Sequence, residues 1–469
     1  MKEAKFSAKA ICVGIDDLSI CELERRGILV KCRISKRSNS KFTFNGLSIS
    51  IKDFSEYKIN KHGFSIDHET FKIIRKRLVD AGFLRCLSRY PADSANIFSW
   101  QDIDLLILKN VSYSMALIME LGVDTLIFSS VPHRTATLTL FEVGKHLGLK
   151  LVLCNQSQFP GKMWITNDFR DIGRFESSIE QEEVHIDISR PECQPFYMSN
   201  LKNSNAALIK VIRSYAKASI IVSSQIIFSF FLGRRTGLIK SIDYLRSSFA
   251  RAIFRKIRVK RRFISLTNID NPFVYFPLHL QPEMTTDVLG GEYANQVTTI
   301  LKLKELIPEE NLILIKENPK QTGAYRSKLF YDTIYELKNV YWVSDDTSTF
   351  DLIEKAACVA TITGTVGWEA LRFGKPVICF GSVFYNQLPG VFRVGTNFQW
   401  DDLLQFTFDK IALTAAVKKM SRYLSPGVSN FEYRNIVEEF NPQKNAFEVS
   451  DSIVKYIHHL KSNSFKGGV

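Results

Sequence analysis

The sequence predicts an α/β protein of two Rossmann-like domains that face each other across a cleft, with a helical, basic insertion between them. Three observations support this fold class. The 469 residues are about twice the length at which one hydrophobic core stops growing. Short apolar runs alternate with segments of helical period in both halves of the chain. A strongly cationic stretch separates the two halves. The hydrophobic share of 45% and charged share of 23% are ordinary for a globular protein.

The first half alternates between helical and strand patterns, which is typical of a parallel sheet. The expected strands are residues 28–34, 47–51, 124–128 and 150–154, and the expected helices are 101–121 and 134–147. We assign residues 1–185 to this domain, on the acceptor side of the cleft.

The second half repeats the alternation with sharper boundaries. The expected strands are residues 273–276, 311–316, 340–343, 358–362 and 377–380, and the expected helices are 292–306, 325–337, 349–355 and 367–373. We assign residues 264–445 to this domain. A last helix, within residues 446–469, is expected to pack back on the first domain.

The insertion, residues 186–263, holds most of the net charge of +14. Its part from 234 to 262 has eleven Lys or Arg and one Asp, and apolar residues recur in steps of three and four over 238–257. An amphipathic, cationic helix of this kind suits an anionic membrane surface. A helix packed on the protein is the alternative. We expect no nucleic acid partner, because the aromatic residues lie on or near the apolar stripe.

The chain is expected to be cytoplasmic, associating peripherally with the inner face of the membrane. Its first residues lack the apolar run of a signal peptide. The most apolar segment, residues 218–232, is shorter than the ~20 residues that span a bilayer. The eight cysteines are scattered without a CxxC pair, so we expect reduced core residues.

The segment TITGTVGWEALRFGKP, residues 361–376, passes from an apolar strand through small residues into a helix. Small residues let backbone N–H groups approach a phosphate, and a helix N-terminus favours anions. We predict that Thr363, Gly364, Thr365 and Gly367 hold the phosphate and that Glu369 accepts from ribose hydroxyls. A strand–turn–helix corner with glycines for packing is the alternative. GxxxxGK[ST] and GxGxxG are absent, so no ATPase or dinucleotide fingerprint is indicated.

The segment FPLHLQPEMTTDVLGG, residues 276–291, follows the first strand of the second domain, where doubly wound sheets bind ligands. Glu283 or His279 is a candidate general acid or base. Gln281, Thr285 and Thr286 are candidates for contacting the sugar or the acceptor. A surface loop that caps the next helix is the alternative. No metal site is predicted.

Three further strand ends carry polar candidates. Lys316 and Asn318 follow the strand 311–316 and are predicted to meet phosphate, although an exposed lysine without a role is equally compatible. His133 and Gln156 follow two strands of the first domain. His133 is a third catalytic candidate, or a helix-capping residue, and Gln156 is an acceptor candidate.

These motifs together resemble the bacterial capsular polysaccharide biosynthesis proteins, a family that includes transferases of 3-deoxy-manno-octulosonic acid (Kdo). The resemblance is carried by FPLHLQPEMTTDVLGG, IKENP, TGTVGWEALRFGKPVICFG and, in the first domain, VPHRTATLTLFEVGKHLGLKLVLCNQSQFPG. It implies a GT-B-like fold, a nucleotide held mainly by the second domain, and a mechanism without metal. Many relatives carry His-Pro where this chain has Asn318–Pro319, so the donor stays open, with CMP-Kdo as one candidate.

The resulting hypothesis is a glycosyltransferase that moves a sugar from a nucleotide-activated donor to a growing capsule or lipopolysaccharide, or to its lipid-linked precursor. It needs no cofactor beyond the donor. One alternative is a sugar-nucleotide epimerase or hydrolase of similar architecture, which needs no acceptor. Another is a non-catalytic polysaccharide assembly or nucleic-acid-binding protein that uses the basic stretch.

Overall fold

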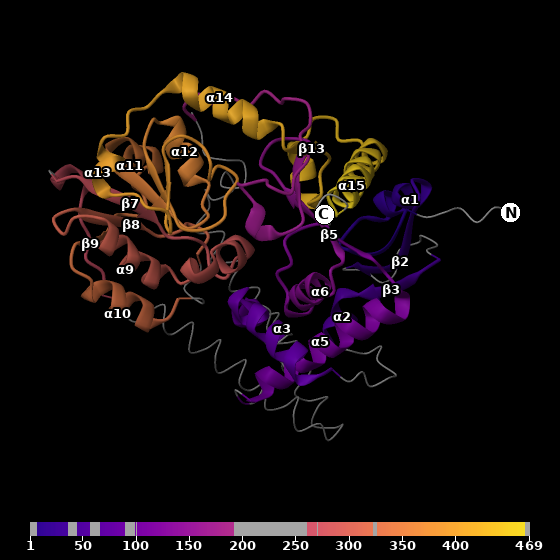
Figure 1. Ribbon diagram of the computed structural model, residues 1–469. Coiled ribbons are helices and arrows are strands. Elements are labelled where there is room, and N and C mark those ends of the chain that lie inside the picture. Colours follow the sequence, from indigo (N-terminus) through magenta and orange to yellow (C-terminus); the bar gives the residue numbers. More distant parts are fainter. Residues whose placement is uncertain are drawn as a thin grey trace, which may run out of the picture.

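The computed structural model describes residues 7–35, 45–56, 66–89, 99, 101–191, 260–269, 271–321 and 326–464. Within these residues the chain forms a seven-stranded and a six-stranded sheet. Figure 1 shows them as two separate bodies, the first drawn in indigo to magenta and the second in salmon to orange. The structure therefore confirms the predicted α/β fold with two Rossmann-like domains.

The first sheet has the strand order β13-β6-β5-β4-β1-β2-β3. Its strands are β1 (Ala8–Val13), β2 (Ile28–Ser35), β3 (Leu47–Ser50), β4 (Thr125–Phe128), β5 (Lys150–Gln156), β6 (Lys162–Thr166) and β13 (Leu424–Pro426). β1 pairs in parallel with both β2 and β4, while β6 is antiparallel to β5 and to β13. The chain thus builds outward in one direction through β3 and then returns beside β1 as β4, which creates a switch point between β1 and β4.

The second sheet is parallel throughout, with the order β12-β11-β10-β7-β8-β9. Its strands are β7 (Phe273–Pro277), β8 (Leu312–Lys316), β9 (Val340–Trp342), β10 (Cys358–Thr361), β11 (Val377–Cys379) and β12 (Val391–Arg393). This order reverses between β7 and β10. A loop after each of these two strands contains one of the two motifs singled out in the sequence of this domain.

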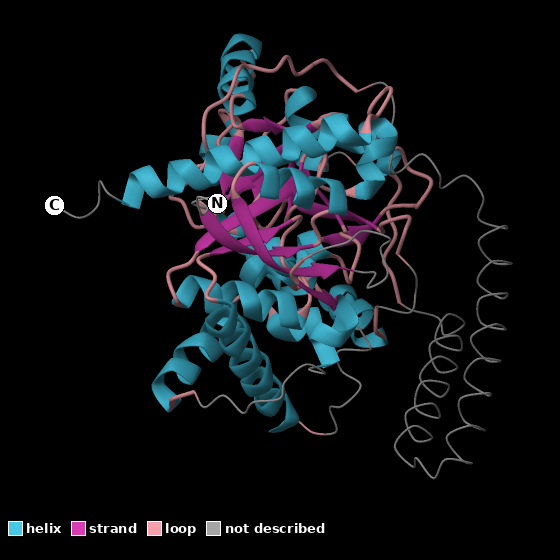
Figure 2. Cartoon of the chain, turned by 90° about the vertical axis from the view of Figure 1, so that its right-hand side faces the viewer, coloured by secondary structure: helices cyan, strands magenta, loops and turns pink. Residues whose placement is uncertain are grey.

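Helices lie on both sides of the strands (Figure 2). Those of the first domain are α1 (Asp17–Arg25), α2 (Ile51–Glu56), α3 (His68–Asp80), α4 (Phe83–Arg89), α5 (Gln101–Leu121), α6 (Thr135–His146) and α15 (Pro442–Ser464). Those of the second are α9 (Gln296–Leu306), α10 (Lys328–Glu336), α11 (Thr349–Lys355), α12 (Val366–Arg372), α13 (Trp400–Leu404) and α14 (Lys410–Ser421). The sequence patterns before residue 100 had left β1, α1, α3 and α4 unassigned.

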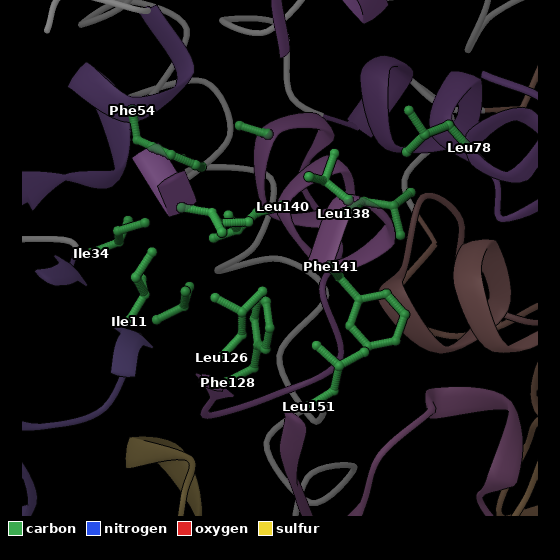
Figure 3. Packing of buried hydrophobic residues seen from close by; sticks show 14 of the residues in the cluster. Ile11, Ile34, Phe54, Leu78, Leu126, Phe128, Leu138, Leu140, Phe141 and Leu151 are labelled. Atoms are coloured by element: carbon green, nitrogen blue, oxygen red, sulfur yellow. The ribbon is translucent and has the colours of Figure 1, made fainter. Parts of the chain in front are cut away.

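The core of the first domain packs α2, α3 and α6 against one face of the sheet. Figure 3 shows Leu138, Leu140 and Phe141 of α6 beside Leu126 and Phe128 of β4. All five side chains are buried, and each contributes roughly 1.5–3 kcal/mol relative to an exposed position. Ile127 of β4 is buried in a separate cluster on the opposite face, which explains why residues 126–128 form an unbroken apolar run.

The chain returns to the first domain earlier than the sequence indicated. Leu424–Pro426 forms β13 and pairs with β6 of the first sheet, so the predicted boundary at residue 445 lies too late. Helix α15 then packs against α1 and β5, and Figure 1 shows it in yellow beside the indigo α1. A three-residue strand that joins another domain's sheet gives no local signal in the sequence.

An aromatic seam joins the two domains on one side. Trp164 of β6 stacks on Phe384 of the second domain with ring centres 6.1 Å apart and planes at 18°, and Phe159 meets Trp368 of α12 edge-on. Gly173 is also required here, because its φ is +92° and a Cβ would lie 1.9 Å from the carbonyl oxygen of Val383. This seam fixes how the domains face each other.

Most of the basic insertion lies outside the described residues, including the predicted helix over 238–257 and the apolar segment 218–232. Its last basic residues are described and pack on the second domain. The guanidinium of Arg261 lies 4.6 Å from the ring centre of Trp342, and that of Arg262 lies 5.0 Å from the ring centre of Tyr335. These two charges stack on aromatic rings of the protein itself.

Two further observations concern the described ranges alone. None of their seven cysteines is in a disulfide, and six of the seven are buried. No helix in these ranges combines the length and the apolar character needed to cross a bilayer.

Candidate functional site

A cleft of about 1520 Å³ lies between the two domains, at the switch points of both sheets. The loops after β1 and β4 line it from the first domain, and those after β7 and β10 line it from the second. Residues 427–441, which we call the return loop, connect β13 to α15 and form a further wall. Open α/β sheets bind ligands at their switch points, and here the switch points of both sheets line the same cleft.

The turn after β10 is held by protein hydrogen bonds. The N–H of Gly364 donates to Oγ1 of Thr361 over 3.0 Å, and the N–H of Thr363 donates to Nε2 of His279 over 3.1 Å. Two of the backbone donors predicted for a phosphate are therefore already used. Thr363 Oγ1 is buried without a hydrogen-bond partner in the described part, and Thr363, Gly364 and Thr365 all line the cleft.

Gly367 has a packing role and does not line the cleft, which corrects its predicted contact with phosphate. A Cβ on Gly367 would lie 2.4 Å from the hydroxyl oxygen of Tyr385. That hydroxyl donates to the carbonyl oxygen of Gly364. The glycine therefore lets Tyr385 reach under the turn.

His279 lines the cleft but positions the turn after β10. Its Nε2 accepts the N–H of Thr363, and its carbonyl oxygen accepts from Nη2 of Arg326 over 2.8 Å. Burial, assisted by the Arg326 charge, lowers the pKa of His279 to about 3. A neutral imidazole whose Nε2 is already an acceptor is poorly suited to proton transfer near neutral pH. The geometry argues against the catalytic role predicted for it.

Glu369 is a buried carboxylate aimed at the cleft. It lies on α12, is 6% exposed and lines the cleft. Burial raises its pKa to about 7, and the charge of Arg372 opposes that shift. No hydrogen bond within the described residues lowers that pKa. The residue is buried yet open to the cleft, so a ligand can donate hydrogen bonds to its carboxylate and offset the cost of burying it.

Glu283 lies where both domains and the return loop meet. Burial raises its pKa, while a hydrogen bond from Thr285 and the charges of Arg89 and Lys320 lower it. Arg89 belongs to α4 of the first domain. Burial raises the pKa of Tyr433 in the return loop, and the nearby Glu283 charge adds to that shift. Glu283 and Thr285 both line the cleft.

Gln281 and Thr286 do not line the cleft, contrary to the prediction that they contact a sugar. The side-chain NH₂ of Gln281 donates to the carbonyl oxygen of Ala294 over 2.8 Å, and its Oε1 accepts from Gln296 over 2.6 Å. Thr286 is fully buried. Both residues stabilise the loop that presents Glu283.

Gln156 does not line the cleft either, and its side chain holds the return loop in place. Its Oε1 accepts the N–H groups of Ser429 and Asn430 over 3.0 and 3.1 Å. Its NH₂ group donates to the carbonyl oxygens of Ser157 and Lys162. With these groups engaged and the residue away from the cleft lining, the structure gives no support to the predicted contact of Gln156 with an acceptor.

Lys316, Asn318 and His133 line the cleft. Nζ of Lys316 donates to the carbonyl oxygen of Thr347 over 2.5 Å, and burial lowers its pKa. Oδ1 of Asn318 accepts the N–H of Lys320 over 2.9 Å. Nδ1 of His133 lies 2.8 Å from the carbonyl oxygen of Val131, and because a carbonyl only accepts, this nitrogen carries the proton.

The sequence reasoning missed three residues that line the cleft: Asp16 and Asp17 on the first domain and Arg434 on the return loop. Asp16 and Asp17 follow β1, where Oδ2 of Asp16 meets Nη2 of Arg434 at 3.3 Å and Oδ1 of Asp17 meets Nη1 of Arg33 at 2.5 Å. The sequence signal for Asp16 and Asp17 was the string VGIDD, residues 13–17, in which two acids follow the apolar residues of β1. A Cβ on Gly14 would lie 2.3 Å from Oγ of Ser129, so a glycine is needed where β1 and β4 diverge.

No cluster of three or more His, Cys, Asp or Glu side chains suited to a metal ion occurs in the part of the chain that the structure describes.

One family of known proteins matches part of the chain, mainly in the second domain. Residues 234–399 match the family of capsule polysaccharide biosynthesis proteins, which confirms the resemblance over that stretch. No curated protein is similar to the chain in sequence.

Several solved structures align with the chain at low identity. KpsC of Thermosulfurimonas dismutans aligns through its β-Kdo 2,4 transferase at 15% identity over 45% of this chain and 62% of that one, with a TM-score of 0.25. Its β-Kdo 2,7 transferase aligns at 12% identity over 76% and 97%, with a TM-score of 0.31. The UDP-GlcNAc 2-epimerase of Methanocaldococcus jannaschii aligns at 11% identity over 96% and 99%, with a TM-score of 0.23. The chain thus spans less than two thirds of the first of these structures.

Proposed function

We propose that this chain is a glycosyltransferase that moves a sugar from a nucleotide-activated donor to a growing capsule or lipopolysaccharide, or to its lipid-linked precursor. The match of residues 234–399 to capsule polysaccharide biosynthesis proteins supports the polysaccharide product. We expect a GT-B type enzyme that needs no metal, in which side chains and backbone groups of the second domain stabilise the leaving phosphate.

One observation carries the proposal: a single cleft receives the switch-point loops of two Rossmann-like sheets. Each switch point can hold one ligand, so the cleft suits a reaction between a donor and an acceptor. The walls differ in character. The second domain offers Glu369, for which no ion pair occurs among the described residues, whereas the first offers acids that are already ion-paired. An epimerase or hydrolase would need no binding wall for an acceptor, and the family match does not favour either.

On the donor side, we assign the ribose hydroxyls to Glu369 and the phosphate to the turn formed by Thr363 and Thr365. Thr363 Oγ1 is a buried oxygen without a partner in the described part, and Thr365 lies on the same cleft surface. Lys316 is near enough to the cleft to neutralise phosphate charge. The nucleotide stays open, with CMP-Kdo as one candidate donor.

For the chemical step, we assign general acid or base catalysis to Glu283. Burial raises its pKa above the ordinary value of a glutamate, and a raised pKa favours a carboxyl that donates a proton. His133, across the cleft on the loop after β4, is the second candidate, because its Nδ1 is committed to a carbonyl and its ring is thereby oriented.

A thermal-shift screen of UDP-, GDP-, TDP- and CMP-sugars tests the proposal. A donor at ~100 times its Kd is expected to add about 2.7 kcal/mol to the free energy of unfolding. The sugar that stabilises the chain is then supplied with candidate glycan acceptors, and transfer is followed by release of the nucleotide. If none of the four classes of nucleotide sugar binds, the proposal is wrong.

A further inference from the structure

The return loop places an exposed aromatic ring on the wall of the cleft. Phe431 lines the cleft and is 73% exposed. Among the described residues, no other strongly exposed large hydrophobic side chain lines it. Water in contact with an aromatic ring is unfavourable, and a ligand that covers the ring removes that cost.

The backbone that carries Phe431 is fixed from both sides. Gln156 accepts the N–H groups of Ser429 and Asn430, and Oγ of Ser429 donates to the carbonyl oxygen of Cys154 over 2.9 Å. Oδ1 of Asn430 then accepts the N–H of Glu432 over 3.0 Å. A ring on a backbone anchored to the end of β5 is already organised before a ligand arrives, so little ordering entropy is lost on binding.

A guanidinium lies against this ring. The Arg434 guanidinium lies 5.3 Å from the ring centre of Phe431 and 5.1 Å from that of Phe440. The same guanidinium pairs with Asp16 at 3.3 Å. Its charge is therefore compensated, and Asp17 is compensated by Arg33 in the same way. The wall combines an open aromatic ring with carboxylates whose charge is balanced.

From this arrangement we infer that Phe431, with Asp16 and Asp17, forms a subsite for a neutral pyranose ring of the acceptor. The weakly positive C–H face of a pyranose stacks on the negative face of an aromatic ring. Asp16 already accepts from the N–H and Oγ of Ser19 at the start of α1, as well as from Arg434, and the sugar hydroxyls donate to the acceptor sites that remain on the two carboxylates. Because the charges are paired, the wall offers no net positive charge to select an acidic sugar. The inference rests on the proposed function and names the acceptor class at its site.

Saturation-transfer NMR on the full chain tests the subsite with three probes: methyl β-glucopyranoside, methyl β-galactopyranoside and methyl β-glucuronide. At least one neutral glycoside is expected to bind more tightly than the glucuronide. Phe431→Ala is expected to weaken that binding about tenfold, or about 1.4 kcal/mol. Phe431→Trp keeps an aromatic face and is expected to retain it.

Phe447→Ala is the matched control. Phe447 is also an exposed ring, at 54%, with the guanidinium of Arg26 at 4.3 Å from its centre, but it lies on α15 outside the cleft. This variant is expected to bind the glycosides as the wild type does. An equal loss in both alanine variants would mean that the ring at 431 has no special role.

The nucleotide-sugar screen on the same proteins separates this inference from the proposed function. If a nucleotide sugar binds but Phe431→Ala binds the glycosides unchanged, or if no neutral glycoside binds the wild type, the acceptor subsite is wrong and the transferase proposal stands. If no nucleotide sugar binds, the transferase proposal is wrong. Preference for the glucuronide would overturn the assignment of a neutral sugar.

Discussion

Replacing Glu369 with glutamine is expected to stabilise the fold at alkaline pH. Burial raises the pKa of this carboxyl to about 7 from an ordinary value of 4.5, so the folded state holds its proton more tightly than the unfolded state does. The contribution of this carboxyl to the free energy of unfolding is therefore fully present below the ordinary pKa and is lost as the pH rises through 7. At 1.36 kcal/mol per unit, the ionised carboxyl costs about 3 kcal/mol. Glu369→Gln removes that cost because an amide does not ionise.

The assay is chemical unfolding of the wild type and of Glu369→Gln from about pH 4 to about pH 8, the range over which the difference develops. The two proteins are expected to match at the acid end and to differ by up to about 3 kcal/mol at the alkaline end. Glu317→Gln is the control in the same cleft. Glu317 pairs with the buried Arg326 at 3.0 Å, so its loss leaves a buried charge unpaired and destabilises the fold.

Glu369→Gln is expected to weaken binding of the donor, although it stabilises the fold. A hydrogen bond to a charged group contributes roughly 1.5–3 kcal/mol, so Glu369→Gln should weaken donor affinity about ten- to a hundredfold in a calorimetric titration. A variant that is more stable and binds more weakly is what a carboxylate reserved for a ligand requires. A less stable variant at alkaline pH would refute the reasoning, because it would mean that the folded chain already satisfies the carboxylate.

Three other changes test the site and the insertion. Glu283→Gln is expected to lower turnover by about 10² to 10⁴ with donor affinity unchanged, and near-normal turnover would move the acid or base role to His133. His279→Ala leaves the N–H of Thr363 without its acceptor and should lower the free energy of unfolding by at least about 1–3 kcal/mol; an unchanged melting temperature would contradict the positioning role. Residues 234–262 are expected to bring the chain to vesicles that contain anionic lipid in a flotation assay, and equal recovery with neutral vesicles would exclude that interaction.

The sequence by itself determined the fold class and the location of much of the site. Apolar runs and helical periods depend on which faces of an element are buried, and these patterns are local. They gave α5 and α11 with their observed bounds, and strands β4, β7 and β10 to within one or two residues. Parallel strands end at one edge of a sheet, so polar loops after them indicated a ligand site before any contact was known. Glu283 and Glu369 were predicted in this way, and both line the cleft.

Only the tertiary structure decided what the polar residues of these loops do. His279 and Gln281 lie two positions apart, yet one holds the turn after β10 and the other binds Ala294 and Gln296. Gln156 anchors a segment that begins more than 270 residues later. A hydrogen bond depends on where its partner lies in space, and residue type and spacing leave that partner unspecified. Phe431 reaches the cleft for the same reason, because the pairing of β13 with β6 brings the return loop there.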